Sequence, residues 1–148
     1  MGVGGYAVII AIPEGIVLKN RGKIILHTKN ITAKRLEAVG ILSSLVIIRL
    51  LHLYMGQGNR EQQEIKVICD NKGVVNQLTR VRERSMNVGD YNLPDCDVLM
   101  QSRKEILALE DRGFRVSISY EKAHQDRTKY AGPLKFRAAL NVEADIQA

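Results

Sequence analysis

The sequence has only two cysteines, Cys69 and Cys96, and their spacing fits no common pattern of metal ligands. Cys69 lies inside an apolar run, which favours a reduced, intracellular protein, cytoplasmic or nuclear, without a disulfide framework. The stretch MGVGGYAVII lacks a basic region ahead of its apolar residues, so no secretion signal is predicted. The most apolar window, residues 40–55, contains Arg49 and His52 and is too short to cross a bilayer as a helix. We therefore expect a core helix there and no membrane contact.

Phosphate loops, internal repeats and linkers are also lacking. The junction Asp70-Asn71-Lys72-Gly73 has a single glycine, whereas a loop that cradles phosphate is rich in glycine. With 148 residues and 45% hydrophobic content, the chain is sized for a single domain, residues 1–148, with one core. The excess of 22 Lys and Arg over 16 Asp and Glu gives a net charge of +6, which favours an anionic partner such as nucleic acid.

The hydrophobic patterns predict a mixed α/β fold. Short β-type runs separated by Pro13-Glu14-Gly15 and Arg21-Gly22 indicate an antiparallel meander of three strands. Helical and strand patterns then alternate, which calls for a mixed sheet with helices packed on its faces. The expected elements are strands at residues 6–12, 16–19 and 23–28, a helix at 32–54, a strand at 65–69, helices at 73–84 and 94–111, a strand at 114–120 and a helix from 134 to the C-terminus.

Glu37 places a charge on an otherwise mainly apolar helix face. In the predicted helix, the residues that share this face with Glu37 are Ile41, Ser44, Ile48 and Leu51. Two interpretations are open. The carboxylate either complements the helix dipole in the first turn and reaches water, or it points inward at the rim of the sheet.

Other polar residues follow elements of the predicted sheet. Asp70 is either the N-cap of the next helix or a side chain at the carboxyl end of a strand, where open α/β folds place their chemistry. His124, in a polar loop, is either a solvated side chain or a proton carrier. Asp145 is by default a surface residue of the final helix. A further acidic group also suggests a metal site, but helix capping and complementarity to the helix dipole explain it better; it comprises Asp90, Asp95 and Asp97.

Taken in this order, these residues and their surroundings resemble the ribonuclease H family, most closely the domains carried by retrotransposon reverse transcriptases. The similar segments are GVGGYAVII (2–10), AKRLEAVGILSSL (33–45), VICDNKGVV (67–75), PDCDVLM (94–100), EKAHQD (121–126) and LNVEAD (140–145). The resemblance implies a ribonuclease H-like mixed sheet, an antiparallel meander plus parallel strands, flanked by helices. It also implies an endonuclease that hydrolyses RNA in RNA–DNA hybrids as part of a reverse transcriptase polyprotein.

The resemblance assigns roles to individual residues. Glu37, Asp70 and Asp145 would bind Mg²⁺, with Mn²⁺ as the alternative, and His124 would assist proton transfer or product release. Two such ions roughly 4 Å apart activate a water and stabilise the leaving oxygen, and hard cations take oxygen ligands. The RNA strand would be recognised through its 2′-hydroxyls. The basic residues expected to meet phosphates, each equally well explained as solvated surface charge, are Arg80, Arg82, Arg84, Arg103, Lys104, Lys122, Arg127 and Lys129.

The chain departs from the family pattern at the first strand. In the family this strand carries an aspartate that bridges both metals, and it precedes a glycine-rich turn resembling residues 2–5. No residue stands before Met1 here, so we expect the first, central strand and its aspartate to be absent. Weak binding of two ions and two unpaired facing edges would follow. The alternative hypothesis is that the chain is an inactive remnant or domesticated domain that only binds nucleic acid. A third hypothesis is that it is an unrelated α/β module.

Overall fold

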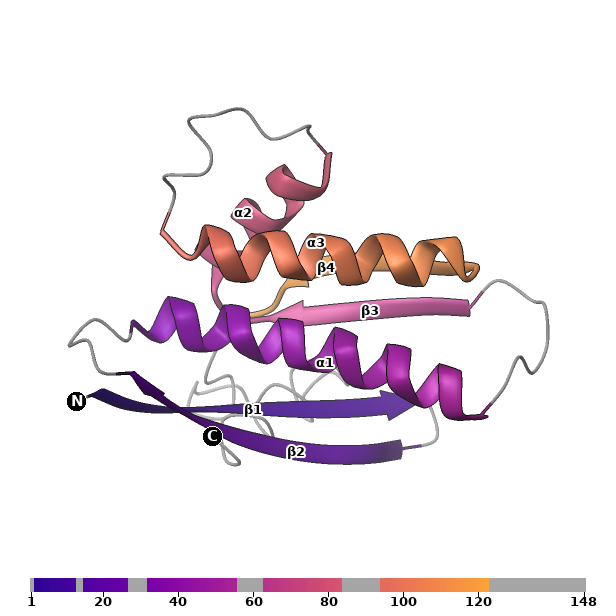
Figure 1. Ribbon diagram of the computed structural model, residues 1–148, viewed down its shortest axis with the longest axis horizontal. Coiled ribbons are helices and arrows are strands. Elements are labelled where there is room, and N and C mark those ends of the chain that lie inside the picture. The colour runs from indigo at the N-terminus through magenta and orange to yellow at the C-terminus, as the bar shows by residue number, and fades with distance from the viewer. Residues whose placement is uncertain (1, 13–14, 27–31, 56–62, 84–93, 123–148) are drawn as a thin grey trace, which may run out of the picture.

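The computed structural model describes residues 2–12, 15–26, 32–55, 63–83 and 94–122. Over these residues the fold is mixed α/β, with two small sheets and three helices (Figure 1). In chain order the elements are β1 (Gly2–Ile12), β2 (Gly15–Leu26), α1 (Ala33–Met55), β3 (Gln63–Cys69), α2 (Lys72–Glu83), α3 (Cys96–Asp111) and β4 (Phe114–Tyr120).

The first sheet is an antiparallel ribbon of β1 and β2. The prediction of two separate strands after β1 is wrong, because β2 runs through Arg21 and Gly22 without a break. Gly22 pairs with Tyr6, and a side chain at position 22 would overlap the Tyr6 ring. The glycine therefore makes room for the aromatic ring and does not end the strand.

The second sheet is a parallel pair of β3 and β4. Parallel neighbours need a long crossover, and α2 and α3 lie in the connection between these two strands. The predicted strand at 114–120 is confirmed, and the strand at 65–69 and the helices at 73–84 and 94–111 differ by one or two residues at their ends. The helix predicted from residue 134 lies outside the described residues.

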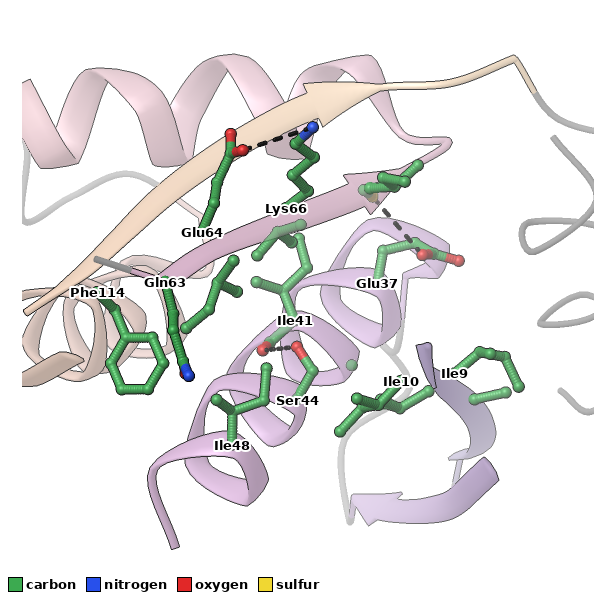
Figure 2. Close-up of a pocket in the computed structure, with 17 residues that line it drawn as sticks. Ile9, Ile10, Glu37, Ile41, Ser44, Ile48, Gln63, Glu64, Lys66 and Phe114 are labelled. Carbon is green, nitrogen blue, oxygen red and sulfur yellow. Dashed lines mark hydrogen bonds and ion pairs between the residues drawn. The ribbon is translucent and has the colours of Figure 1, made fainter. Parts of the chain in front are cut away.

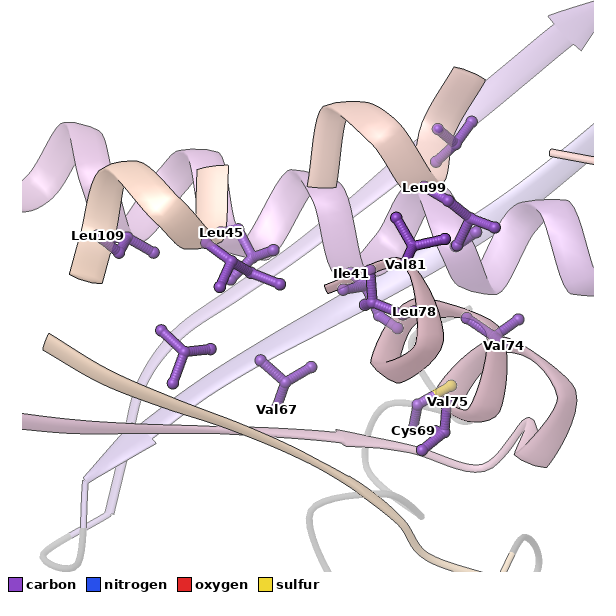
Figure 3. Packing of buried hydrophobic residues seen from close by; sticks show 14 residues of the cluster. Ile41, Leu45, Val67, Cys69, Val74, Val75, Leu78, Val81, Leu99 and Leu109 are labelled. Atoms are coloured by element: carbon purple, nitrogen blue, oxygen red, sulfur yellow. The ribbon is translucent and has the colours of Figure 1, made fainter. Parts of the chain in front are cut away.

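Helix α1 packs on both sheets, against β1 on one side and against α3 and β3 on the other. At Gly40 its backbone passes close to β1, since a Cβ added there would lie 3.7 Å from the Cβ of Tyr6. On the opposite side, Leu45 is 0% exposed and Ile41 is 6% exposed (Figure 3). The helix predicted at 32–54 is thus confirmed and lies at the centre of the fold.

One hydrophobic cluster joins α1, α2, α3, β3 and β4. On α2 the buried residues recur every three or four positions, which is the spacing of a helix with one apolar face. Ser102 is buried with the cluster, and its hydroxyl donates to the carbonyl of Val98 at 2.9 Å. The buried members are Ala38, Ile41, Leu45, Val67, Cys69, Val74, Val75, Leu78, Val81, Val98, Leu99, Ile106, Leu109 and Val116.

Ion pairs join α1 to α3 at two places along the helices. Arg49 Nε donates to Glu105 Oε2 at 2.5 Å, and Glu105 is only 7% exposed. Arg35 donates to Asp95 at 3.1 Å and to Asp97 Oδ2 at 2.7 Å. A carboxylate in a core is costly without such a partner, so these contacts fix how the two helices align.

The capping role predicted for Asp95 is wrong. Asp95 occupies the N-cap position of α3 with φ 64°, but its side chain makes no capping hydrogen bond. Arg35 binds that carboxylate instead. Asp97 lies in the first turn as expected, and its hydrogen bond from Arg35 lowers the pKa of the Asp97 carboxyl. Asp90 lies outside the described residues.

Among the described residues, α1 is the one helix long and apolar enough to cross a membrane by length and composition alone. The core helix of a soluble protein and a signal sequence meet the same criteria. The packing of α1 against both sheets fits the expected core helix. Large apolar side chains are nevertheless exposed near its C-terminal end, namely Leu50, Leu51, Leu53, Tyr54 and Met55.

We predict that Leu45→Ala lowers the free energy of unfolding by about 3 kcal/mol, because it removes a fully buried side chain between α1 and α3. Urea denaturation followed by circular dichroism measures the change. Leu53→Ala is the matched control, since Leu53 is 48% exposed on the same helix, and it should change stability by less than about 0.5 kcal/mol. Equal losses in the two variants would contradict the placement of α1.

Candidate metal-binding site

The carboxyl end of β3 meets the start of α1. There Glu37, Cys69 and Asp70 each offer one ligand atom, and these atoms all lie within 4.8 Å of one another. Glu37 comes from α1, while Cys69 and Asp70 come from the end of β3 and the bend after it. The structure thus brings together two of the four predicted site residues. His124 and Asp145 lie outside the described residues.

Glu37 lies beside the end of β3 and is partly shielded from solvent. It is half-buried and lines a groove between β1 and β3 (Figure 2). Its Oε2 accepts a hydrogen bond from the Cys69 thiol at 3.8 Å. The helix face predicted from the sequence lines the groove through Ile41, Ser44 and Ile48, whereas Leu51 is 38% exposed. Of the two interpretations of Glu37, the structure favours the inward carboxylate.

Asp70 does not cap the helix that follows it. The cap is Asn71, whose Oδ1 accepts a hydrogen bond from the backbone N–H of Val74 at 3.2 Å. The sequence pattern had suggested Asp70 for this role, but the neighbouring asparagine fills it. An Asn three residues before the first buried α2 position was the available signal. Asp70 is therefore placed at the strand end without a capping function.

Cys69 is the member of the group that sequence reasoning missed as a site residue. Its side chain is 3% exposed, and burial raises the pKa of the thiol to about 12, with the nearby Glu37 and Asp70 carboxylates adding to the shift. At neutral pH the thiol keeps its proton and donates a hydrogen bond to Glu37 Oε2. Without a metal the group is therefore two carboxylates beside a protonated thiol, and the carboxylate oxygens suit a hard cation.

The basic residues expected to meet phosphates have varied surroundings. Arg82 donates to the carbonyl of Val116 at 2.5 Å and pairs with Glu110, so it is held within the fold. The Nε of Arg103 is buried without a hydrogen-bond partner, while Lys104 is exposed. Arg80 and Lys122 belong to the described residues that make interactions. The remaining three lie outside the described residues and are Arg84, Arg127 and Lys129.

Comparison with protein-family models, with curated proteins and with solved structures finds no match to this chain. The class that the described residues define is a mixed α/β fold with a carboxylate pair at the end of a parallel strand.

We predict that Asn71→Ala lowers the free energy of unfolding by about 1 kcal/mol, because it removes the N-cap of α2. The neighbouring Asp70→Asn variant should cause no comparable loss of unfolding free energy. Asp70 does not cap α2, and the substitution relieves charge repulsion with Glu37. Thermal or urea unfolding of both variants measures the difference. A larger loss for Asp70→Asn would mean that Asp70 has a structural role.

We predict that iodoacetamide alkylates Cys69 roughly tenfold or more slowly than Cys96 in the folded chain at pH 8. Cys69 is buried and its thiol pKa is raised from the ordinary 9.0 to about 12, whereas Cys96 is partly exposed. The Cys69 thiol loses its proton at lower pH in the unfolded chain than in the folded chain. The free energy of unfolding should therefore fall as pH rises from about 9 to 12. Peptide mass spectrometry measures labelling, with the urea-unfolded chain as the control. Equal folded-state rates would contradict the burial of Cys69.

Proposed function

We propose that this chain is a ribonuclease H-type domain that hydrolyses RNA in RNA–DNA hybrids as part of a retroelement reverse transcriptase. The observation that carries the proposal is the meeting of Glu37 from α1 with Asp70 at the end of β3. These are two of the residues to which the sequence resemblance assigns metal binding. Their proximity supports the assignment because they come from separate elements of the fold.

The arrangement of elements gives further support. An antiparallel ribbon, a long helix and then two parallel strands linked through helices is the order implied by a ribonuclease H-like sheet. One difference stands out. The described strands form two separate pairs, β1 with β2 and β3 with β4, instead of one continuous sheet.

The donor chemistry fits Mg²⁺, with Mn²⁺ as a substitute. Two carboxylates held close together repel each other, and a divalent cation relieves that repulsion. When bound, the metal would activate a water and stabilise the leaving oxygen of the phosphodiester. The hydrogen bond from Cys69 orients Glu37, while the end of β3 positions Asp70.

Further groups are needed for a two-metal site, since each hard cation takes about six oxygen ligands. We propose Asp145 as the third protein carboxylate and His124 as the residue that assists proton transfer or product release. The net charge of +6 favours approach to a polyanion. Contacts with 2′-hydroxyls would select the RNA strand of the hybrid.

The alternative function, binding of nucleic acid without cleavage, is favoured by one observation. Within the described residues, the candidate metal group contains two carboxylates and one protonated thiol, which is a small ligand set for two ions. A domain of this kind would bind hybrids in a salt-dependent way and leave the RNA intact.

We predict that Glu37→Gln and Asp70→Asn each reduce Mg²⁺-dependent hybrid cleavage by roughly a hundredfold or more, because each removes one proposed metal ligand. Gel analysis of an end-labelled RNA strand annealed to DNA measures cleavage, with a chelator as the metal control. Asp111→Asn is the matched control variant, since Asp111 is an exposed carboxylate at the C-terminal end of α3. It should retain full activity.

Two other outcomes are informative in that experiment. Cleavage that survives Asp70→Asn would contradict the proposed role of Asp70. Binding of the hybrid by the unaltered chain, without any cleavage in Mg²⁺ or Mn²⁺, would support the non-catalytic alternative.

A further inference from the structure

The face of the β1–β2 ribbon that points away from α1 carries a row of basic side chains. Side chains of a strand alternate between its two faces, and Tyr6 and Val8 of β1 lie on the face that α1 covers (Figure 1). Their partners on β2, Gly22 and Asn20, lie on that same face. The β2 side chains that alternate with these partners therefore lie on the outer face. They are Lys19, Arg21 and Lys23.

The charge of this row is exposed and is not offset within the ribbon. All three basic residues are exposed, and the segments that form β1 and β2 contain no Asp or Glu. The residues opposite the row on β1 are small or apolar, namely Gly5, Ala7 and Ile9. The outer face of the ribbon therefore presents one line of positive charge beside an uncharged surface.

The geometry of the row restricts which anion fits it. A strand rises about 3.4 Å per residue, so the three charges follow one another at roughly 7 Å intervals along β2. A linear polyanion can meet all of them at once, and a nucleic-acid strand carries one phosphate per nucleotide. A duplex presents two backbones, and the uncharged residues of β1 offer nothing to the second one. Anionic lipid surfaces attract clusters of about four to eight basic residues, which is more than this face holds.

We propose that the outer face of the β1–β2 ribbon binds the backbone of single-stranded nucleic acid, RNA or DNA, through Arg21 and Lys23. Lys19, which is one of the described residues with another interaction, extends the same row. Tyr6 is the one aromatic residue within β1 and β2, and it lies on the opposite face, so the outer face has no ring on which a base can stack. Binding therefore runs through phosphates and is independent of base sequence.

This surface is separate from the candidate metal group. Glu37 belongs to α1, which packs on the other face of the ribbon, while Asp70 follows β3 of the second sheet. A nucleic-acid strand held on the outer face needs no metal for its contacts with Arg21 and Lys23. The proposal therefore goes beyond the cleavage proposed above and does not depend on it.

The test measures binding of labelled oligo-dT and oligo-U to the complete chain by fluorescence anisotropy, with a chelator present so that no metal contributes. The test variant, Arg21→Gln with Lys23→Gln, removes two charges from the outer face. The matched control, Arg112→Gln with Arg115→Gln, removes two charges from exposed positions at the end of α3 and on β4. A third variant, Arg21→Lys with Lys23→Arg, keeps the charges of the row. Circular dichroism checks that each variant is folded.

We expect the test variant to bind both oligonucleotides roughly tenfold or more weakly than the unaltered chain at low salt. The slope of log K against log salt should become shallower by about 1.4, because each lost phosphate contact of a single strand removes about 0.7. The control variant and the charge-keeping variant should bind within about twofold of the unaltered chain.

Four outcomes would overturn the proposal. Unchanged binding by the test variant would show that the row makes no contact, and equal weakening in the control variant would show that net charge alone attracts the oligonucleotide. Tighter binding of an RNA–DNA hybrid that the test variant loses would assign the face to a duplex. Tighter binding of vesicles of phosphatidylserine and phosphatidylcholine that the test variant loses would assign it to a membrane. No readout here involves cleavage, so failure of this proposal is distinguishable from failure of the proposed function.

Discussion

The packing of α1 against both strand pairs is the interaction on which the rest of the described structure depends. The two sheets share no hydrogen bonds among the described residues, so side-chain contacts of one helix hold them together. Gly40 lets the helix approach β1, while Ile41 and Leu45 fill the core beneath α3. The ion pairs to Asp97 and Glu105 then fix the alignment of α1 with α3.

The candidate site follows from that docking. Because α1 crosses the end of β3 near its own start, Glu37 comes to lie beside Cys69 and Asp70. The same helix face forms the floor of the groove between β1 and β3. The carboxylate pair and the groove are therefore two consequences of one packing arrangement.

Much of the fold could be predicted from the sequence, because hydrophobic periodicity fixed α1, α2, α3 and both parallel strands to within one or two residues at their ends. The pattern failed at Gly22, since the Tyr6 ring that covers it comes from the neighbouring strand. In the site, the proximity of Glu37 to Asp70 is compatible with the prediction. Local sequence could not reveal that Arg35 of α1 binds Asp95 at the start of α3. Such long-range contacts depend on tertiary packing.

The central claim is that Glu37 and Asp70 together bind a divalent cation. The most direct measurement is titration of the ¹⁵N-labelled chain with Mn²⁺, whose unpaired electrons broaden the NMR signals of nearby amides. We expect amides at positions 37 and 69–71 to broaden first, at substoichiometric Mn²⁺, and to recover when Mg²⁺ is added in excess. Equal broadening at acidic residues across the surface, or first broadening near Asp97, would contradict the account.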